Sequence, residues 1–223
     1  MAVDKYKKIY INSLQEIENV YNRLINSKLA FMVIDINGVL NVLTKEYGLF
    51  VIESEEAFVK EYNKNKFYKT KVVYEDYNIS GEDLNLFYSY IEKFKYVFCK
   101  RYYGEYIFGC IAVKTDNGFI TTIRGKKTLE DYTFVKDVNH QNLTIDVVNK
   151  KAALNAPLLD YLFRNNDQIK VIVHLNQIFD ENLEYYDYEF PGTIKDSQRN
   201  NIRSFNIRNH GVVYLFDSND KCL

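Results

Sequence analysis

The stretch between Val171 and Val213 is the most informative part of the sequence for the fold and the site. It reads Val-Ile-Val-His-Leu-Asn over 171–176, Phe-Pro-Gly-Thr over 190–193 and Asn-His-Gly-Val-Val over 209–213. A run of β-branched residues that ends in a histidine predicts a buried strand with His174 at its rim. Asn-His-Gly before a second apolar run predicts a tight turn that directs His210. Two imidazoles at strand ends could form a metal site or an acid–base pair, or could serve the structure alone.

The composition argues against several classes of function. The chain has 223 residues, a net charge of −1 and 26% charged residues, so it lacks the basic excess of nucleic-acid-binding proteins. We find no apolar run near the roughly 20 residues that span a bilayer, and no secretory signal. We therefore expect neither nucleic acid nor a membrane as a partner. Cys99, Cys110 and Cys222 are odd in number and far apart, which indicates reduced thiols and a cytoplasmic location.

Residues 1–79 are predicted to form a small α/β unit, whose role the residues do not indicate. Strands are expected at 8–12, 29–34, 47–52 and 69–75, and helices at 13–24 and 54–62. Asn37-Gly38 follows the second strand and is typical of a hairpin turn.

Residues 80–223 are predicted to form an α/β domain with a mixed, largely antiparallel sheet flanked by helices. Ser80 begins the clearest amphipathic helix of the chain. At least six strand-like runs follow between Tyr106 and Val213, joined by short turns, which differs from the alternation of a doubly wound parallel sheet. We also expect helices at 152–164 and 194–204, a solvated loop at 180–189, and an exposed His140 without a function.

Several short motifs of this second part resemble, in the same order, those of the class II aldolase/adducin family. They are Phe108–Lys114, Gly118–Gly125, Leu129–Val135, Ala156–Asp160, the strand that ends at His174, Pro191–Thr193 and Asn209–Gly211. The resemblance covers about residues 80–215 and implies an aldolase-type core preceded by an added domain.

In the enzymes of that family, three histidines hold a divalent metal that polarises a carbonyl, so that a neighbouring C–C bond can break. The resemblance places two of these ligands on His174 and His210, and the third on Asn176. Residues two apart in a strand face the same side, so 174 and 176 could share one ion. An amide oxygen is a poor ligand for zinc and suits harder ions better. We therefore expect a divalent metal (Zn, Mn or Fe) bound less tightly than by three histidines.

The same resemblance assigns the acid/base role to Asp160, one methylene shorter than the family's glutamate. Alternatively, Asp160, His174 and His210 could form a site of two histidines and one carboxylate. Phosphate contacts fall on Gly109, Cys110, Arg124, Gly125 and Lys126, and the family's serine pair falls on Leu158 and Leu159. The hydroxyl groups are thus lost, although Arg124 and Lys126 could supply charge for an anion.

Two functions follow from the resemblance. The first is a metal-assisted lyase, decarboxylase or epimerase that acts on a small sugar acid or sugar phosphate. The second is a non-catalytic, adducin-like domain for binding or assembly, with a degenerate site. The retained histidines favour the first, and the lost histidine and serines favour the second. The family also implies a homo-oligomer, commonly a tetramer.

Overall fold

A computed structural model describes residues 6–44, 48–98, 106–199, 203–208 and 210–223. The chain divides into two compact units. The smaller unit contains residues 1–64 and 100–108, and the larger contains residues 65–99 and 109–223. No helix of the described residues is long and apolar enough to cross a membrane.

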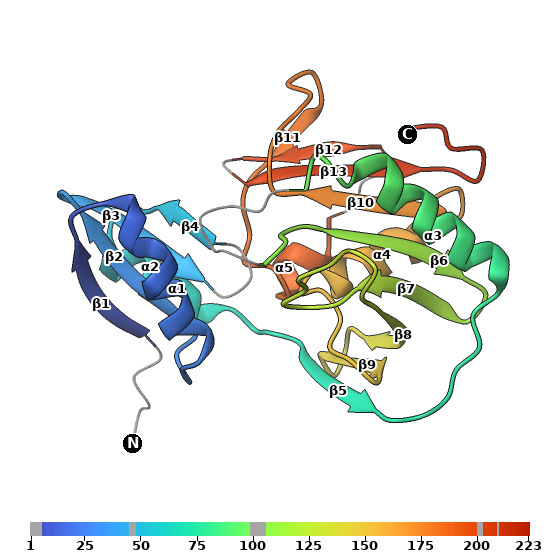
Figure 1. Cartoon of the computed structure of the whole chain (residues 1–223), viewed down its shortest axis with the longest axis horizontal. Coiled ribbons are helices and arrows are strands. Elements are labelled where there is room, and N and C mark those ends of the chain that lie inside the picture. Colours follow the sequence, from blue (N-terminus) through green and yellow to red (C-terminus); the bar gives the residue numbers. More distant parts are fainter. Residues whose placement is uncertain (1–5, 45–47, 99–105, 200–202, 209) are drawn as a thin grey trace. The chain divides into compact units, whose positions relative to one another are not determined.

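The smaller unit is a four-stranded sheet with helices, drawn in blue in Figure 1. Its elements are β1 (Tyr6–Ile11), the 3-10 turn η1 (Leu14–Glu16), α1 (Ile17–Ile25), β2 (Phe31–Ile36), β3 (Val39–Thr44), β4 (Gly48–Val51) and α2 (Glu55–Lys64). The strands lie in chain order, with β1 parallel to β2 and the other pairs antiparallel. Asn37 and Gly38 have φ values of 52° and 85°, so the predicted hairpin turn is confirmed.

The core of the smaller unit is completed by residues distant in sequence. Tyr21 of α1 packs its ring edge-to-face against Tyr106 and Phe108, at centroid distances of 5.8 and 6.2 Å. Phe108 is 5% exposed and belongs to the same buried cluster as Ile17 and Leu24. A segment that follows α3 in the chain therefore supplies part of this core.

The larger unit contains a nine-stranded sheet. Its elements are β5 (Lys69–Val73), α3 (Gly81–Phe94), β6 (Cys110–Thr115), β7 (Gly118–Thr122), β8 (Tyr132–Asn139), β9 (Thr144–Val148), α4 (Ala156–Asn165), β10 (Val171–Leu175), β11 (Glu184–Tyr186), α5 (Ile194–Ser197), β12 (Phe205–Ile207) and β13 (Gly211–Phe216). The strand order is β11-β12-β13-β10-β6-β7-β8-β9-β5, and only the pairs β11–β12 and β5–β9 are parallel among the described strands of this sheet. The predicted mixed, largely antiparallel sheet flanked by helices is confirmed.

Helices α3 and α4 pack on opposite faces of this sheet, because side chains alternate along each strand. Phe216 of β13 contacts Tyr90 of α3, whereas its neighbour Leu215 lies in the cluster that contains Leu159 of α4. Ser80 caps α3 by accepting a hydrogen bond from the Asp83 N–H, as the sequence predicts. Figure 1 shows α3 along one side of the sheet and α4 behind it.

Several predicted boundaries differ from the structure. β5 pairs with β9, so the larger unit begins at Asn65 and not at residue 80. That pairing joins distant segments and leaves no local pattern in the sequence. α4 begins at Ala156 rather than at 152, and α5 ends at Ser197. The predicted loop at 180–189 contains the short strand β11.

Candidate functional site

β10 places His174 under the start of α4. The register pairs His174 with Cys110 of β6 on one side and with Val213 of β13 on the other. Ile172, two residues earlier, lies in the core cluster beneath α4, so the His174 side chain faces the same way. All five residues of β10 are buried, which explains the continuous apolar run in the sequence.

The structure brings His174 and His210 together. Their ring centroids lie 5.1 Å apart with the planes inclined by 34°. His174 is 1% exposed, and its Nε2 atom is buried with no hydrogen-bond partner among the described residues. The ring of Tyr188 packs edge-on against His210 at 5.4 Å. Asn176, which follows β10, is buried as well.

Asn155 is the residue of α4 that contacts this pair. Its Nδ2 lies 3.4 Å from Nδ1 of His174, and it occupies the N-cap position of the helix. The sequence pattern Asn-Ala-Pro is a helix-start signal, because proline is tolerated in the first turn. That signal would have identified Asn155 in place of Asp160 as the residue at this end of the helix.

The electrostatics of the site keep His174 neutral. Burial, together with the positive charges of Lys126 and Arg199, lowers the pKa of His174 to about 3. Burial also lowers the pKa of Lys126 to about 8, whereas it raises the pKa of the Cys110 thiol to about 11. The site therefore combines a neutral imidazole, a protonated thiol and an ammonium group that can lose its proton near neutral pH.

Arg199 was not predicted from the sequence. Its guanidinium is buried, donates from Nη2 to the Asp187 carbonyl at 2.8 Å and pairs with the Asp196 carboxylate at 3.4 Å. Burial raises the pKa of Asp196 to about 6, although Arg199 opposes this shift. We expected residues 194–204 to form a helix and assigned no function to any side chain in it.

Three of the five predicted anion-binding residues lie close to His174. Lys126 donates a hydrogen bond from Nζ to the Gly109 carbonyl, and Cys110 pairs with His174 in the sheet. Gly109 has a φ of 92°, and a Cβ there would lie 2.4 Å from the His174 carbonyl, so glycine is required. Arg124 and Gly125 follow β7, where the Arg124 N–H bonds the Lys151 carbonyl. Their predicted role in binding an anion stays a prediction.

Asp160 lies in a different cluster of side chains. Its carboxylate accepts hydrogen bonds from Nε2 of His140 at 2.9 Å and from Nε of Arg164 at 2.7 Å. His140 also contacts the Tyr68 hydroxyl through Nδ1 at 2.6 Å and is half-buried, so the expectation of an exposed histidine is wrong. A catalytic role for Asp160 stays a prediction.

The described side chains limit the metal that this site could hold. We find no cluster of three or more histidine, cysteine, aspartate or glutamate side chains in the described parts of the chain, so Asp160 does not complete a two-histidine site. The buried, unpartnered Nε2 of His174 beside the His210 ring nevertheless fits a metal ligand pair. Among the described residues, Asn176 could add an oxygen ligand, which fits a weakly bound divalent ion.

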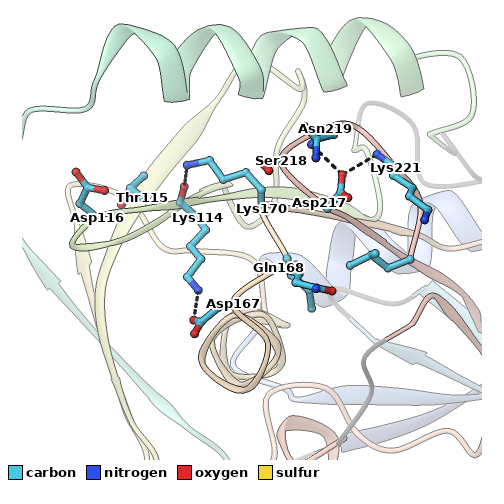
Figure 2. A pocket seen from close by; sticks show the side chains of 12 residues that line it. Lys114, Thr115, Asp116, Asp167, Gln168, Lys170, Asp217, Ser218, Asn219 and Lys221 are labelled. Atoms are coloured by element: carbon cyan, nitrogen blue, oxygen red, sulfur yellow. Dashed lines mark hydrogen bonds and ion pairs between the residues drawn. The ribbon is translucent and has the colours of Figure 1, made fainter.

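A cavity of about 570 Å³ lies at the opposite ends of β6, β10 and β13. Figure 2 shows that several of its charged side chains are paired: Lys114 pairs with Asp167, and Lys170 donates to the Lys114 carbonyl. Asp217 accepts hydrogen bonds from the backbone N–H groups of Asn219 and Lys221. These interactions hold together the three turns that line the cavity. The described thiols, Cys110 and Cys222, are both free, and Cys99 lies outside the described residues.

Three solved structures illustrate what the chain is similar to. YgbL of Escherichia coli, named as a candidate aldolase/epimerase/decarboxylase, shares 17% identity over 60% of this chain and 76% of its own, with a TM-score of 0.42. YgbL of Klebsiella pneumoniae shares 14% identity over 62% and 80%, with a TM-score of 0.45. L-fuculose-1-phosphate aldolase of Thermus thermophilus shares 13% over 61% and 80%, with a TM-score of 0.41. These proteins are of the kind that the sequence motifs resemble, and the likeness concerns the fold alone. No protein-family model and no curated protein matches the chain.

Proposed function

We propose that the larger unit is an aldolase-like, metal-assisted lyase, decarboxylase or epimerase that acts on a small sugar acid or sugar phosphate. The observation that supports this most is the pairing of His174 with His210, where the buried Nε2 atom of His174 has no hydrogen-bond partner among the described residues. A buried polar atom without a partner costs free energy, so its retention suggests a ligand that is bound during function.

The protein side chains have separate parts in this proposal. His174, His210 and Asn176 would hold a divalent ion such as Zn²⁺, Mn²⁺ or Fe²⁺, which supplies a Lewis acid for a substrate carbonyl. His174 is already neutral, so binding an ion requires no loss of a proton from it. Lys126 and Arg199 bring two positive charges close to His174, which suits a substrate carboxylate or phosphate.

Lys126 is the residue best suited to move a proton in this site. An effective acid or base has a pKa near the working pH, and burial brings the pKa of Lys126 to about 8. Asp160, in contrast, is held by His140 and Arg164. Gly109 and Cys110 would line the substrate side of the strand, and Arg124 and Gly125 stay candidate contacts for the anion.

A second function, a non-catalytic and adducin-like binding or assembly domain, is favoured by one specific observation. The helix residue in contact with His174 is Asn155, whose amide cannot exchange a proton as a carboxylate does. Leu158 and Leu159 are also buried in the core, where they offer no hydroxyl to a phosphate. If this function holds, the histidine pair is a remnant of an ancestral site.

Metal titration of the purified protein distinguishes the two functions. We expect Zn²⁺ to bind the wild type, His210→Ala to abolish that binding, and Asn176→His to tighten it by at least about tenfold, the scale of a good additional ligand. Turnover of hydroxy-carbonyl compounds, sugar phosphates and sugar acids should depend on the added metal and on His210. Absence of metal binding in the wild type, or binding that survives in His210→Ala, would reject the enzyme and leave the binding domain.

The same proposal includes the assembly and the compartment. The enzymes whose motifs this chain resembles form symmetric oligomers, so we propose a homo-oligomer for this chain. We also propose a cytoplasmic location, with neither nucleic acid nor a membrane as a partner. Light scattering at micromolar concentration tests the assembly, and a strict monomer would argue against active sites shared between subunits.

A further inference from the structure

We propose that Tyr68, His140 and Asp160 form a positioning chain for the His174 site, which acts through α5. This inference rests on the proposed function, because it gives these residues a task in that site. The chain consists of three hydrogen bonds in series, and none of its members contacts either histidine of the pair directly in the described contacts.

In each of these hydrogen bonds, one group donates and the next accepts, and this sequence orients the side chains. Arg164 and Nε2 of His140 both donate to the Asp160 carboxylate, at 2.7 and 2.9 Å. With its proton on Nε2, a neutral His140 accepts at Nδ1 from the Tyr68 hydroxyl, 2.6 Å away. The same hydroxyl accepts from Oγ of Ser197, a fully buried residue of α5, at 3.2 Å, and the Ser197 hydroxyl also lies 2.9 Å from the Ile194 carbonyl. The carboxylate therefore orients the imidazole, and the imidazole orients the phenol.

The backbone around Tyr68 holds the same segment a second time. The Tyr68 N–H donates to the Gly192 carbonyl at 2.9 Å, Phe67 forms an antiparallel bridge with Thr193, and the Ile194 N–H donates to the Lys66 carbonyl. Residues 66–68 thus form a strap along the Pro-Gly-Thr turn and the start of α5. The backbone of Tyr68 and its side chain therefore both bind the segment that contains the Pro-Gly-Thr turn and α5.

Two routes lead from the strapped segment to His174. Gly192 packs against Leu154, where a Cβ would lie 3.1 Å from Cγ, and Leu154 directly precedes Asn155 with its contact to His174. Asp196 of α5 pairs with Arg199, whose charge acts on His174. The strap therefore acts on Asn155, which contacts the imidazole, and on Arg199, whose charge lowers its pKa. In this arrangement Asp160 is a positioning residue rather than a catalytic one.

Tyr68→Phe tests the chain, because it removes the hydroxyl and keeps the ring and the backbone bond. We expect the amides of residues 194–197 to exchange about fivefold faster, the effect of one lost hydrogen bond, and those of β10 to change little. Zn²⁺ affinity should fall about tenfold, as when a group that orients a metal ligand is lost. Tyr161→Phe is the matched control, since its ring also contacts His140, at 6.0 Å, without joining the chain. His140→Ala should reproduce the exchange effect if the Tyr68 variant is too unstable to measure. Ser197→Ala is unsuitable for this purpose, because it also removes the bond to the Ile194 carbonyl inside α5.

A double-mutant cycle establishes whether His140 acts through Tyr68. His140→Ala alone should accelerate exchange in α5, and it should add little in the Tyr68→Phe background. Unchanged exchange in Tyr68→Phe, or fully additive effects of the two changes, would overturn the positioning chain. Exchange is measured without metal, so the two proposals can fail separately. If the wild type binds no Zn²⁺, the proposed function is rejected, but the hydrogen bonds that stabilise α5 are not. If Tyr68→Phe exchanges normally and still binds Zn²⁺, the positioning chain is rejected.

Discussion

At the scale of single residues, the proposed site depends on the neutral imidazole of His174, which lies near the two cations Lys126 and Arg199. His174 is buried, and the charges of Lys126 and Arg199 oppose its protonation. An imidazolium in this place would be shielded from water, and the described groups that shift its pKa are two cations and no carboxylate. The residue is therefore suited to act as a ligand or an acceptor and unsuited to act as a general acid.

This neutrality predicts an acid-sensitive stability. The pKa of His174 is about 3 in the folded protein and 6.5 as a model value, so the unfolded state binds more protons between these two pH values. Stability from this residue is complete above pH 6.5 and is lost as the pH falls towards 3. Urea unfolding should show a loss of roughly 3 kcal/mol between about pH 7 and pH 4 that is absent in His174→Gln. Equal pH profiles for the two proteins would contradict this account.

The sequence indicated some residues of the site and could not indicate others. His174 and His210 are recognisable because each lies at the end of a local pattern, a β-branched run or an Asn-His-Gly turn. Lys126 and Arg199 act on His174 through the folded structure, and nothing in their local sequence signals that proximity. The partner of Asp160 was missed for the same reason, since His140 lies in a turn that is brought to α4 only by the sheet.

At the scale of elements, the approach of β13 to the end of β10 brings the two histidines together. Gly211 begins β13 directly after His210, and a Cβ on it would lie 1.9 Å from the Leu175 carbonyl. That carbonyl belongs to backbone and cannot move away as a flexible side chain would. Gly211 thus permits the close contact of β10 and β13. From the sequence alone, this glycine was predicted only to form a turn.

Gly211→Ala should therefore destabilise the protein by at least about 2 kcal/mol, because the strands must separate to admit a methyl group. Gly81→Ala is the matched control: a Cβ at this first residue of α3 meets nothing within 4 Å. The control should be neutral or stabilising by up to about 1 kcal/mol. Chemical denaturation of the three proteins measures both effects, and a harmless Gly211→Ala would show that the strands tolerate a wider spacing.

The strands and the amphipathic helices were predictable because their periodicity is local, and their arrangement was less so. The nine-stranded sheet follows the predicted type, yet the assignment of β5 to it depends on pairing with β9. The helix α4 was placed four residues too early, so that Asn155, which is its N-cap and its contact with His174, was expected inside the helix. The assignment of Asp160 came from the family resemblance instead, and its catalytic role stays a prediction.

At the scale of the whole molecule, the chain completes its smaller unit only after it has begun the larger one. β5 and α3 belong to the larger unit, and the chain then supplies Phe108 to the core of the smaller unit. A boundary drawn once along the sequence cannot describe this arrangement. Any fragment that ends before residue 108 lacks part of a core.

This interleaving predicts that one substitution late in the sequence will weaken the N-terminal unit. Phe108→Ala should destabilise the smaller unit by roughly 3 kcal/mol, because it removes a buried ring from the cluster around Tyr21. Amide exchange should accelerate in β2 and stay unchanged in β10, provided that the two units open separately. Phe163→Ala, a comparable loss in the core beneath α4, should produce the reverse pattern. Exchange that accelerates equally in both units for either variant would mean that the chain unfolds as one cooperative body, so that residues 1–64 and 106–108 could not be treated as a separate core.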